Sequence, residues 1–385
     1  MGSSDIVQFL CLVFLVVSIT KVESQKRVFN VMSYGAIADG KSDNTKAIVN
    51  AWNLACESTR GGVVLIPKGS FLVNPIVLKG TCKGEMSFLV KGTLKAPTDR
   101  QYWVNLDHWI SFQYLNNFIL GGGGTLDGQG ASAWSSNTCS RDPNCKQLPT
   151  SLRLDFVTNA SIKYINLINS KNFHMNIFSS HDLKLNHIRI TAPKNSPNTD
   201  GIHIADSTNL QILNSIISTG DDCISIGPGT HDVDINNIEC GPGHGINVSG
   251  LLIRHCNFTG TDNGVRIKTW APSSPSNVYN LTFEHLQMFD VSNPIIIDQH
   301  YCPSDHCAHQ GSSQVQIRDV KFQEIWGSSR SEIAVDLRCS QSRPCQQIEL
   351  KDINLSYNGR NKGATSQCYN VKGVAYGKQQ PPSCL

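Results

Sequence analysis

From about residue 160 onward, short segments of the chain alternate between apolar and polar positions with a period of two residues. Each segment has the form aliphatic–x–aliphatic, followed by a polar or Cys position and a further aliphatic residue. This alternation is typical of β-strands that bury one face. The segments are SIKYINLIN, DLKLNHIRI, NLQILNSII, DVDINNIEC, GLLIRHCNF, NLTFEHLQM, QVQIRDVKF and QIELKDINL. They predict an all-β protein.

These segments recur along the chain at intervals of 18 to 34 residues. Their leading residues are Ile162, Leu183, Leu210, Val233, Leu251, Leu281, Val315 and Ile348, with gaps of 21, 27, 23, 18, 30, 34 and 33 residues. Such recurrence indicates a β-solenoid, in which equivalent strands stack in parallel about 4.8 Å apart. A single coil cannot bury its own apolar side chains, so we expect one domain. A β-sandwich or propeller is the rival fold, but hairpins with Asn-Gly or Asp-Gly turns are sparse.

One segment near the N-terminus, residues 42–62, has the pattern of a helix. Its apolar stripe is formed by Ala47, Ile48, Ala51, Trp52 and Ala55. Asp43 or Asn44 can cap its start, and Gly61 can end it. Because the end of a solenoid exposes apolar residues, we expect this helix to cap the N-terminal end.

The first residues read as a secretion signal. The run FLCLVFLVVSI, from Phe9 to Ile19, is too short to span a bilayer and is typical of the apolar region of a signal peptide. Asp5 and the lack of Lys or Arg before the run are departures from that pattern, and a buried strand or membrane anchor is the alternative. We expect a signal peptide over residues 1–24, a single domain over 25–385, and no membrane contact after cleavage.

Composition supports an exported protein. The chain has 385 residues, 39% apolar and 16% charged, with a formal net charge of +3. Its 14 cysteines leave 13 after Cys11 is removed with the signal peptide, and in a secreted chain close pairs form small disulfide loops. The expected pairs are Cys139/Cys145, Cys302/Cys307, Cys339/Cys345 and Cys368/Cys384, with Cys256 as the free thiol. The N-x-S/T triplets at Asn159, Asn247, Asn257, Asn280 and Asn354 also fit export.

Three acidic residues, one histidine and two basic residues are spaced by about one coil. They are Asp200, Asp221, Asp222, His244, Arg266 and Lys268. The intervals are 21 residues from Asp200 to Asp221, 22 from Asp222 to His244 and 22 from His244 to Arg266. We therefore predict a column of these side chains on one face, rising roughly 5 Å per step. Gly220 is expected to allow a bulge or turn through which both members of the acidic pair face outward.

This column has the chemistry of a glycosidase. Three carboxylates within a few ångströms cannot all ionise freely, so the pKa of at least one should rise. A protonated carboxyl group can then protonate a leaving oxygen while an ionised one activates water. Arg266 and Lys268 would bind an anionic sugar. Two other interpretations are a solvated Asp turn and a Ca²⁺ site, and the nearby cations argue against calcium.

The segments NTD, GDD, GHG and RIK, in this order, resemble the four signature motifs of the plant polygalacturonases. The resemblance runs from Phe29 to the C-terminal pair of cysteines. It implies a right-handed parallel β-helix and a secreted enzyme that hydrolyses polygalacturonate, the pectin of the cell wall, without a metal or other cofactor. The segment NSPNTDGIHI is most similar to pollen-type, exo-acting members. We expect a monomer with no nucleic-acid partner.

The resemblance also implies roles for single residues. Asp221 matches the general acid, Asp200 and Asp222 match the pair that activates water with inversion, and His244 matches the histidine that supports the acid. Arg266 and Lys268 match the residues that bind the galacturonate carboxylate. Tyr301 resembles the tyrosine that lines the subsites, and Cys223–Cys240 resembles a disulfide beside the site.

The chain departs from the family pattern directly after His244. Roughly a dozen residues of the expected GHGxSxGSLG region and the loop after it are missing, and the 18-residue gap noted above is the shortest in the array. If the remaining residues do not complete a coil, the cations shift relative to the acids, and the alternative is a pectin-binding β-helix with an impaired site. A calcium-dependent pectate lyase is a third possibility that the motifs disfavour.

Overall fold

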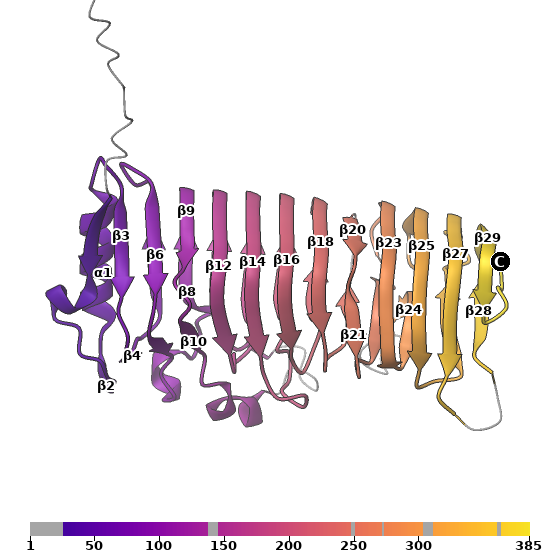
Figure 1. Ribbon diagram of the computed structural model, residues 1–385, viewed down its shortest axis with the longest axis horizontal. Coiled ribbons are helices and arrows are strands. Elements are labelled where there is room, and N and C mark those ends of the chain that lie inside the picture. Colours follow the sequence, from indigo (N-terminus) through magenta and orange to yellow (C-terminus); the bar gives the residue numbers. More distant parts are fainter. Residues whose placement is uncertain (1–25, 138–144, 248–250, 272, 303–310, 360–362) are drawn as a thin grey trace, which may run out of the picture.

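The computed structural model of the chain describes all residues except 1–25, 138–144, 248–250, 272, 303–310 and 360–362. The described residues form an elongated parallel β-helix whose coils follow one another along the long axis (Figure 1). This confirms the predicted β-solenoid. The predicted signal peptide lies outside the described residues. Among the residues that are described, no helix is long and apolar enough to cross a membrane.

One side of each coil belongs to an 11-stranded parallel sheet, here called sheet B, that carries the candidate site. Its strands, in spatial order, are β5 (Ile76–Lys79), β8 (His108–Gln113), β11 (Thr150–Asp155), β13 (Met175–Phe178), β15 (Ile202–Ala205), β17 (Ile224–Ile226), β19 (Ile246–Asn247), β22 (Asn263–Trp270), β24 (Asn293–Tyr301), β26 (Ile333–Arg338) and β28 (Thr365–Tyr369).

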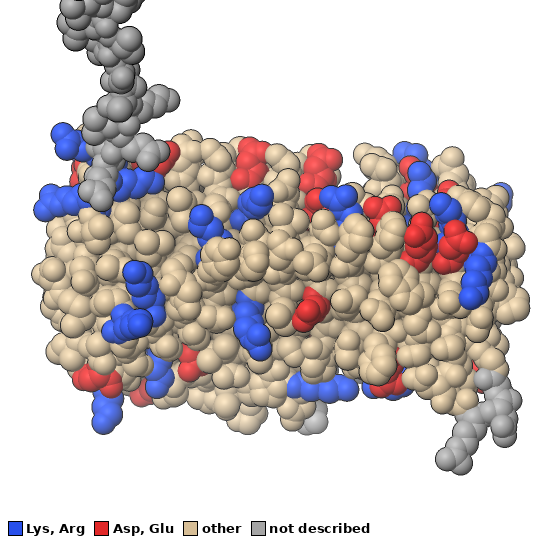
Figure 2. Space-filling model, viewed as in Figure 1, with Lys and Arg blue, Asp and Glu red and all other residues tan. Residues whose placement is uncertain are grey.

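The other side of the coils is an 18-stranded sheet, here called sheet A. Its first strands form two columns, β1 (Arg27–Asn30), β3 (Gly62–Ile66), β6 (Met86–Val90) and β9 (Asn116–Gly121) in one and β2 (Asp39–Asp43), β4 (Ser70–Leu72), β7 (Thr93–Lys95) and β10 (Thr125–Asp127) in the other. Both columns meet at β12 (Thr158–Ile168), and the later strands are β14 (His181–Thr191), β16 (Thr208–Ser218), β18 (His231–Cys240), β20 (Leu251–Arg254), β21 (Asn257–Thr259), β23 (Ser276–Val291), β25 (Val315–Ser329), β27 (Cys345–Tyr357) and β29 (Val371–Gln380). Figure 2 shows charged side chains scattered over the sheet A face between broad uncharged areas.

The long strands of sheet A bend near their middle, and this bend lets one strand cover two sides of a coil. The bend falls at a residue with a left-handed backbone, for example Tyr164 (φ 51°) in β12, Asn214 (φ 48°) in β16 and Asn237 (φ 57°) in β18. Asn tolerates this conformation well. The Asn214 side chain donates to Asn186 Oδ1 at 2.9 Å and accepts from Asn237 Nδ2 at 2.8 Å. These stacked amides keep successive bends in register.

The interior is one continuous stack of apolar side chains from successive coils. In sheet B, Ile202 pairs with Ile224 and Ile224 pairs with Ile246, and all three are fully buried. Because side chains alternate along a strand, the residues between these isoleucines face outward. The outward positions of sheet B therefore form files that run along the molecule.

The predicted helix caps the N-terminal end but is shorter than expected. It forms α1, Thr45–Cys56, and ends well before Gly61. Of the two candidate caps, Asp43 accepts from the backbone N–H of Thr45 at 2.9 Å, whereas Asn44 makes no side-chain cap bond. The buried Trp52 of α1 packs over the first coils, with its ring 5.6 Å from that of Phe112. The described connections contain four short 3-10 helices: η1 (Val31–Tyr34), η2 (Arg100–Tyr102), η3 (Gly130–Ser132) and η4 (Trp134–Ser136).

Four disulfides are described. Those predicted from spacing, Cys339–Cys345 and Cys368–Cys384, are present, as is the pair Cys223–Cys240 that the resemblance implied. A fourth, Cys56–Cys82, was missed because its cysteines are 26 residues apart and lie on different coils. Cys256 is free and buried, as predicted. The expected pairs Cys139/Cys145 and Cys302/Cys307 each include a residue outside the described part of the chain.

Candidate active site

The predicted acidic and imidazole residues all lie just before strands of sheet B. Since Ile202, Ile224 and Ile246 pair in register, the residues two positions earlier, Asp200, Asp222 and His244, are equivalent on three successive coils. Asp221 precedes this position by one residue. The coil step from Asp200 therefore leads to Asp222, 22 residues on, and not to Asp221 as the sequence analysis expected.

The two cations do not continue this column. Arg266 pairs with Asn247 in β19, so it stands three residues further along the coil than His244. The step between these coils is 19 residues, and the prediction of a single vertical file is wrong at this point. The short coil is nonetheless paired on both sides, through β19 in sheet B and through β20 in sheet A. Arg266 and Lys268 belong to strand β22 and contact the carboxylate of Asp222 from there.

Gly220 allows two turns to pack closely, and Asp221 and Asp222 do not both face outward as predicted. A Cβ atom at Gly220 would lie 2.0 Å from the carbonyl oxygen of Ser196, so only glycine fits between the two turns. The side chain of Asp222 is almost fully buried, while that of Asp221 is 21% exposed. The backbone N–H of Asp222 donates to Asp221 Oδ1 at 2.8 Å. The two carboxylates thus occupy different environments.

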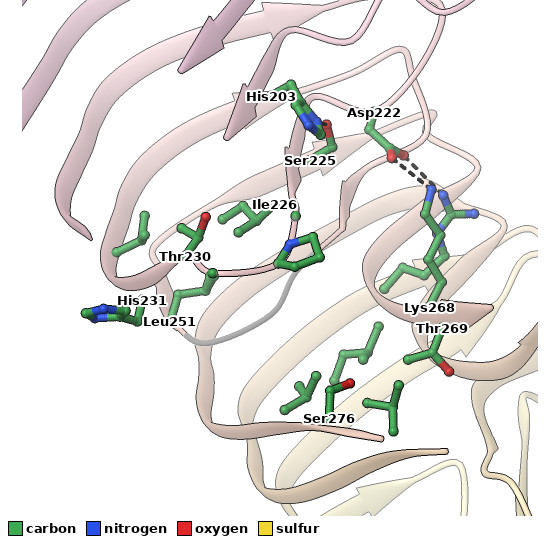
Figure 3. A pocket seen from close by; sticks show the side chains of 18 of the residues that line it. His203, Asp222, Ser225, Ile226, Thr230, His231, Leu251, Lys268, Thr269 and Ser276 are labelled. Carbon is green, nitrogen blue, oxygen red and sulfur yellow. Dashed lines mark hydrogen bonds and ion pairs between the residues drawn. The ribbon is translucent and has the colours of Figure 1, made fainter. Parts of the chain in front are cut away.

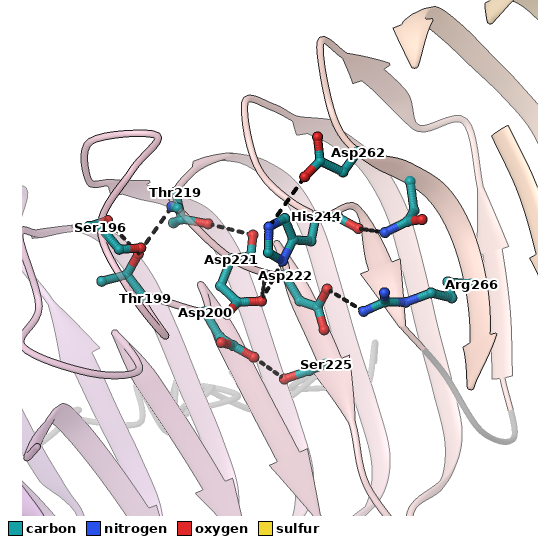
Figure 4. A network of polar contacts seen from close by, with 12 residues as sticks. Ser196, Thr199, Asp200, Thr219, Asp221, Asp222, Ser225, His244, Asp262 and Arg266 are labelled. Carbon is teal, nitrogen blue, oxygen red and sulfur yellow. Dashed lines mark hydrogen bonds and ion pairs between the residues drawn. The ribbon is translucent and has the colours of Figure 1, made fainter. Parts of the chain in front are cut away.

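Asp200 is held by a serine that the sequence analysis did not single out. Ser225 Oγ donates to Asp200 Oδ2 at 2.8 Å (Figure 4). The same oxygen lies 2.8 Å from Nδ1 of His203 (Figure 3). Ser225 and His203 pair across β15 and β17, at outward positions between buried isoleucines. That alternation is the sequence signal that could have identified them.

His244 lies between two carboxylates. Its Nδ1 is 2.8 Å from Asp221 Oδ1, and its Nε2 is 3.4 Å from Asp262 Oδ2 (Figure 4). Arg330 supports Asp262 from the far side, with 3.8 Å between Nη2 and Oδ1. The sequence analysis missed Asp262, although it lies in the segment DNGVRIK that carries both cations.

Asp222 contacts both predicted cations. Arg266 Nη2 is 3.3 Å from Oδ1 of Asp222, and Lys268 Nζ is 3.4 Å from Oδ2. The ring of Tyr301 covers the cations, 5.5 Å from the Arg266 guanidinium carbon and 4.9 Å from Lys268 Nζ. At these separations the aromatic face attracts both charges. All three residues line the groove.

The surroundings of the three carboxyl groups shift their pKa values in different directions. Burial, with the negative charges of Asp221 and Asp222, raises the pKa of Asp200 well above its ordinary value. Burial also raises the pKa of Asp222, although Lys268 and Arg266 oppose the rise. This fulfils the expectation that at least one pKa rises.

The pKa of Asp221 shifts in the opposite direction. Burial alone would raise it, but the hydrogen bond and positive charge of His244 outweigh that effect and hold the pKa of Asp221 below its ordinary value. The same hydrogen bond raises the pKa of His244. Burial together with the charge of Lys268 lowers the pKa of His203 to about 4. His203 is therefore neutral in mildly acidic water.

One set of possible metal ligands lies within this cluster. Ligand atoms of Asp221, Asp222 and His244 all lie within 4.8 Å of one another. Arg266 and Lys268 already contact Asp222, so a divalent cation would meet two positive charges at that carboxylate. The arrangement fits an anionic ligand better than a metal ion.

A groove of about 1910 Å³ runs over these residues. It reaches from Asn198 and Phe173 past the three carboxylates to Trp270 and Tyr301. Figure 3 shows Asp222 and Lys268 on one side of it, joined by a close contact, and Thr230 and Leu251 on the other. Its lining residues belong to or adjoin five successive strands of sheet B, from β15 to β24, which at about 4.8 Å per strand step span roughly 19 Å.

Comparison with known proteins assigns the family. The model of "Glycosyl hydrolases family 28" matches residues 56–384. The chain belongs to glycosyl hydrolases family 28. A second, shorter match, to rhamnogalacturonase A/epimerase, pectate lyase-like proteins, covers residues 28–83.

Relatives within family 28 span almost the entire chain. The sequence is 43% identical to an exopolygalacturonase of Platanus acerifolia, over 94% of this chain and 98% of that protein. It is 42% identical to a polygalacturonase of Nicotiana tabacum, over 94% and 93%. The resemblance to the plant polygalacturonases is thereby confirmed, and the protein is a glycosidase.

The solved structures agree with this assignment at the level of the fold. The polygalacturonase of Erwinia carotovora superposes with a TM-score of 0.72 at 23% identity, covering 91% of this chain and 97% of that one. The predicted right-handed parallel β-helix is confirmed.

Proposed function

We propose that this family 28 protein is a secreted polygalacturonase that hydrolyses the α-1,4 bonds of polygalacturonate in the plant cell wall. The observation that carries the proposal is the contact of Arg266 and Lys268 with the carboxylate of Asp222 at the floor of a long groove. The same cations are placed to bind the carboxylate of a galacturonate unit. Nε of Arg266 is buried and has no hydrogen-bond partner among the described residues.

The reaction in this proposal is a direct displacement by water. Asp222 accepts a proton from water as the water oxygen bonds to the anomeric carbon, and the bond from that carbon to the glycosidic oxygen breaks. Asp221 gives its proton to the departing oxygen, and Asp200 holds the water with Asp222. Attack from the face opposite the departing group inverts the configuration.

The proton affinities support this division of roles. Of the two buried carboxyl groups, Asp222 has the cations that stabilise its ionised form, so it is the base. Burial and the two neighbouring carboxylates raise the pKa of Asp200 well above its ordinary value, and Asp200 positions the water. Asp221 shares a hydrogen-bonded proton with His244 in the free protein. A bound anionic sugar adds negative charge beside Asp221 and raises its proton affinity, which prepares it to act as the acid.

Two finer features belong to the same proposal. Several relatives carry the name exopolygalacturonase, and this favours release of single galacturonate units from a chain end. A signal peptide over residues 1–24 would deliver the protein, acting as a monomer, to the cell wall.

The decisive experiment is product analysis on a defined galacturonate oligomer. We expect reducing ends to appear, loss of that activity in Asp221→Asn, and galacturonate monomer as the main product. A ladder of mixed lengths would show endo action. If no sugar is released over a broad acidic pH range while the oligomer still binds, the protein is a pectin-binding β-helix with an impaired site. Ultraviolet-absorbing unsaturated products would indicate a lyase.

A further inference from the structure

The turn that leads into β13, residues 170–174, contains a histidine that the proposed mechanism does not use. His174 is 0% exposed, so its ring lies entirely inside the protein. The pairing of the strands in sheet B shows which residues occupy the same position on the next three coils, and these are Gly201, Cys223 and Gly245. The repeat therefore places a small residue where this coil has an imidazole, and the reason for the ring must be sought in its own contacts.

Hydrogen bonds determine which ring nitrogen of His174 carries the proton. The backbone N–H of Ser170 donates to Nε2 at 3.3 Å, so Nε2 is an acceptor. Burial lowers the pKa of His174 to about 4, and the ring is neutral in mildly acidic water. A neutral imidazole has one N–H, which is therefore on Nδ1. Nδ1 lies 3.1 Å from the carbonyl oxygen of Asp200 and donates to it.

This bond adds to one that the fold already supplies. The backbone N–H of His174 also donates to the carbonyl oxygen of Asp200, at 2.8 Å, and the equivalent bond one coil further on joins Gly201 to Asp222 at 2.9 Å. A carbonyl oxygen has two lone pairs and can accept both bonds. His174 thus holds one carbonyl oxygen from its main chain and from its ring, which restricts the orientation of the Asp200 main chain as well as its position.

Ser170 provides a fixed support for the ring. Its Oγ donates to the carbonyl oxygen of Phe173 at 2.7 Å and accepts from Ser151 Oγ at 2.8 Å. Its carbonyl oxygen accepts from Nε1 of Trp134 at 3.0 Å. Because these bonds hold Ser170, its N–H has a set direction, and rotation of the His174 ring would break the bond that Nε2 accepts.

The same turn also reaches the carboxyl group of Asp200, through Phe173. The ring of Phe173 stacks on the ring of His203, with 4.9 Å between the centroids. Nδ1 of His203 lies 2.8 Å from Ser225 Oγ, which in turn donates to Asp200 Oδ2 at 2.8 Å. Two adjacent residues of one turn therefore hold the two ends of Asp200, one directly and the other through two intermediate side chains.

From these contacts we infer that His174 is a positioning residue for the hydrolysis, which holds the main chain of Asp200 so that its carboxyl group is correctly placed beside Asp222. The inference rests on the proposed function, in which Asp200 and Asp222 hold the attacking water. The ring itself is buried and cannot touch a substrate. A displacement of about 1 Å in such a site can cost on the order of a hundredfold in rate, so a bond to the main chain of Asp200 is sufficient to affect the reaction.

Two substitutions separate the two hydrogen bonds of the ring. The amide of Asn reaches the place of Nδ1 and that of Gln the place of Nε2, so His174→Asn keeps a donor for Asp200 and His174→Gln keeps an acceptor for Ser170. On polygalacturonate, we expect His174→Gln to lower kcat about tenfold or more with KM within about twofold, and His174→Asn to keep kcat within about threefold. Urea unfolding measures how far each variant is destabilised. His187→Gln, at an exposed residue of β14, is the control and should leave kcat and KM unchanged.

The outcomes distinguish a positioning role from a merely structural one. If kcat per folded molecule is the same in His174→Gln as in the wild type, or if His174→Asn loses as much kcat as His174→Gln, the inference is overturned while the proposed function stands. Each variant decides alone if the other does not fold, since retained kcat in the first or lost kcat in the second is enough. If the wild type releases no sugar from polygalacturonate, the proposed function fails and this role of His174 fails with it.

Discussion

Nδ1 of His244 lies 2.8 Å from Oδ1 of Asp221, and this bond sets the proton affinities of both groups. It raises the pKa of His244 and holds the pKa of Asp221 low against the effect of burial. In the proposed mechanism, this is the pair that delivers a proton to the departing oxygen.

Replacing His244 should therefore impair the reaction more than the fold. We expect His244→Gln to lower kcat/KM on polygalacturonate by about a hundredfold, the usual lower bound for losing a group that assists proton transfer. Wild-type activity should decline as pH rises through the raised pKa of His244, and the alkaline limb should change in the variant. A pH profile of kcat/KM measures both effects, and an unchanged alkaline limb would contradict this role.

The same pair predicts how stability depends on pH. Asp221 has a lowered pKa, so its contribution is present above the ordinary carboxyl value of 3.8 and is lost as pH falls through the lowered value. His244 has a raised pKa, so its contribution is present below the ordinary imidazole value of 6.5 and is lost as pH rises through the raised value. Urea midpoints of the wild type and His244→Gln should differ most near pH 5 and converge at pH 9.

A surface pair provides the control for that measurement. His231 lies 2.8 Å from Asp232, but both side chains are exposed to water. Exposed pairs contribute little to stability. His231→Gln should therefore leave the urea midpoint nearly unchanged at both pH values. An equal effect of His231→Gln and His244→Gln would contradict the stabilising role of the His244–Asp221 pair.

Asp262 is the second carboxylate at His244, and its removal should alter the pH profile without removing a reacting group. Asp262→Asn withdraws a negative charge 3.4 Å from Nε2 of His244, so the pKa of His244 should fall and the alkaline limb of activity should move to lower pH. Asp290 contacts the same Arg330, at 3.9 Å, and serves as the matched control. Asp290→Asn should leave the profile unchanged; an identical shift in both variants would show that Arg330, and not His244, carries the effect.

Removing a cation beside Asp222 should weaken substrate binding and move the acidic limb. Arg266→Gln takes away a charge that stabilises ionised Asp222, so the pKa of Asp222 should rise further. Because the base must be ionised, activity should then appear only at higher pH, and KM should increase. Steady-state kinetics between pH 3 and 7, with exposed Arg189→Gln on sheet A as a control, measure both effects. A lower kcat with unchanged KM and pH profile would contradict the role of Arg266.

We expect the aromatic cluster beside α1 to contribute to stability and not to the reaction. Phe112 is almost fully buried and packs with Trp52, Phe88 and Phe118. Phe112→Ala should lower the free energy of unfolding by about 3–5 kcal/mol, because it removes buried surface and leaves a cavity. Phe289→Ala, at a residue that is 63% exposed, should change it by less than about 1 kcal/mol. Urea unfolding of both variants makes the comparison, and equal losses would contradict the described packing.

The β-helix could be predicted from local pattern because its stabilising contacts repeat. Each coil places aliphatic residues at the same positions, so the stack Ile202, Ile224 and Ile246 appears in the sequence as a spacing. The gathering of Asp200, Asp222 and His244 could be predicted for the same reason, since these residues lie at one position of successive coils. The helix at the N-terminal end followed from its apolar stripe, although its last turn did not form.

The sequence by itself determined the fold class, the capping helix, the free thiol and most of the side chains that gather in the acidic and basic cluster. Only the tertiary structure decided how these residues meet: that Asp200 aligns with Asp222, that Arg266 enters three residues later along its coil, and that Ser225, His203 and Asp262 complete the cluster. The physical reason is that spacing along the chain specifies a position only while coils have equal length. Where coils differ in length, as on either side of the short coil, hydrogen bonds between strands set the register, and no local pattern records it.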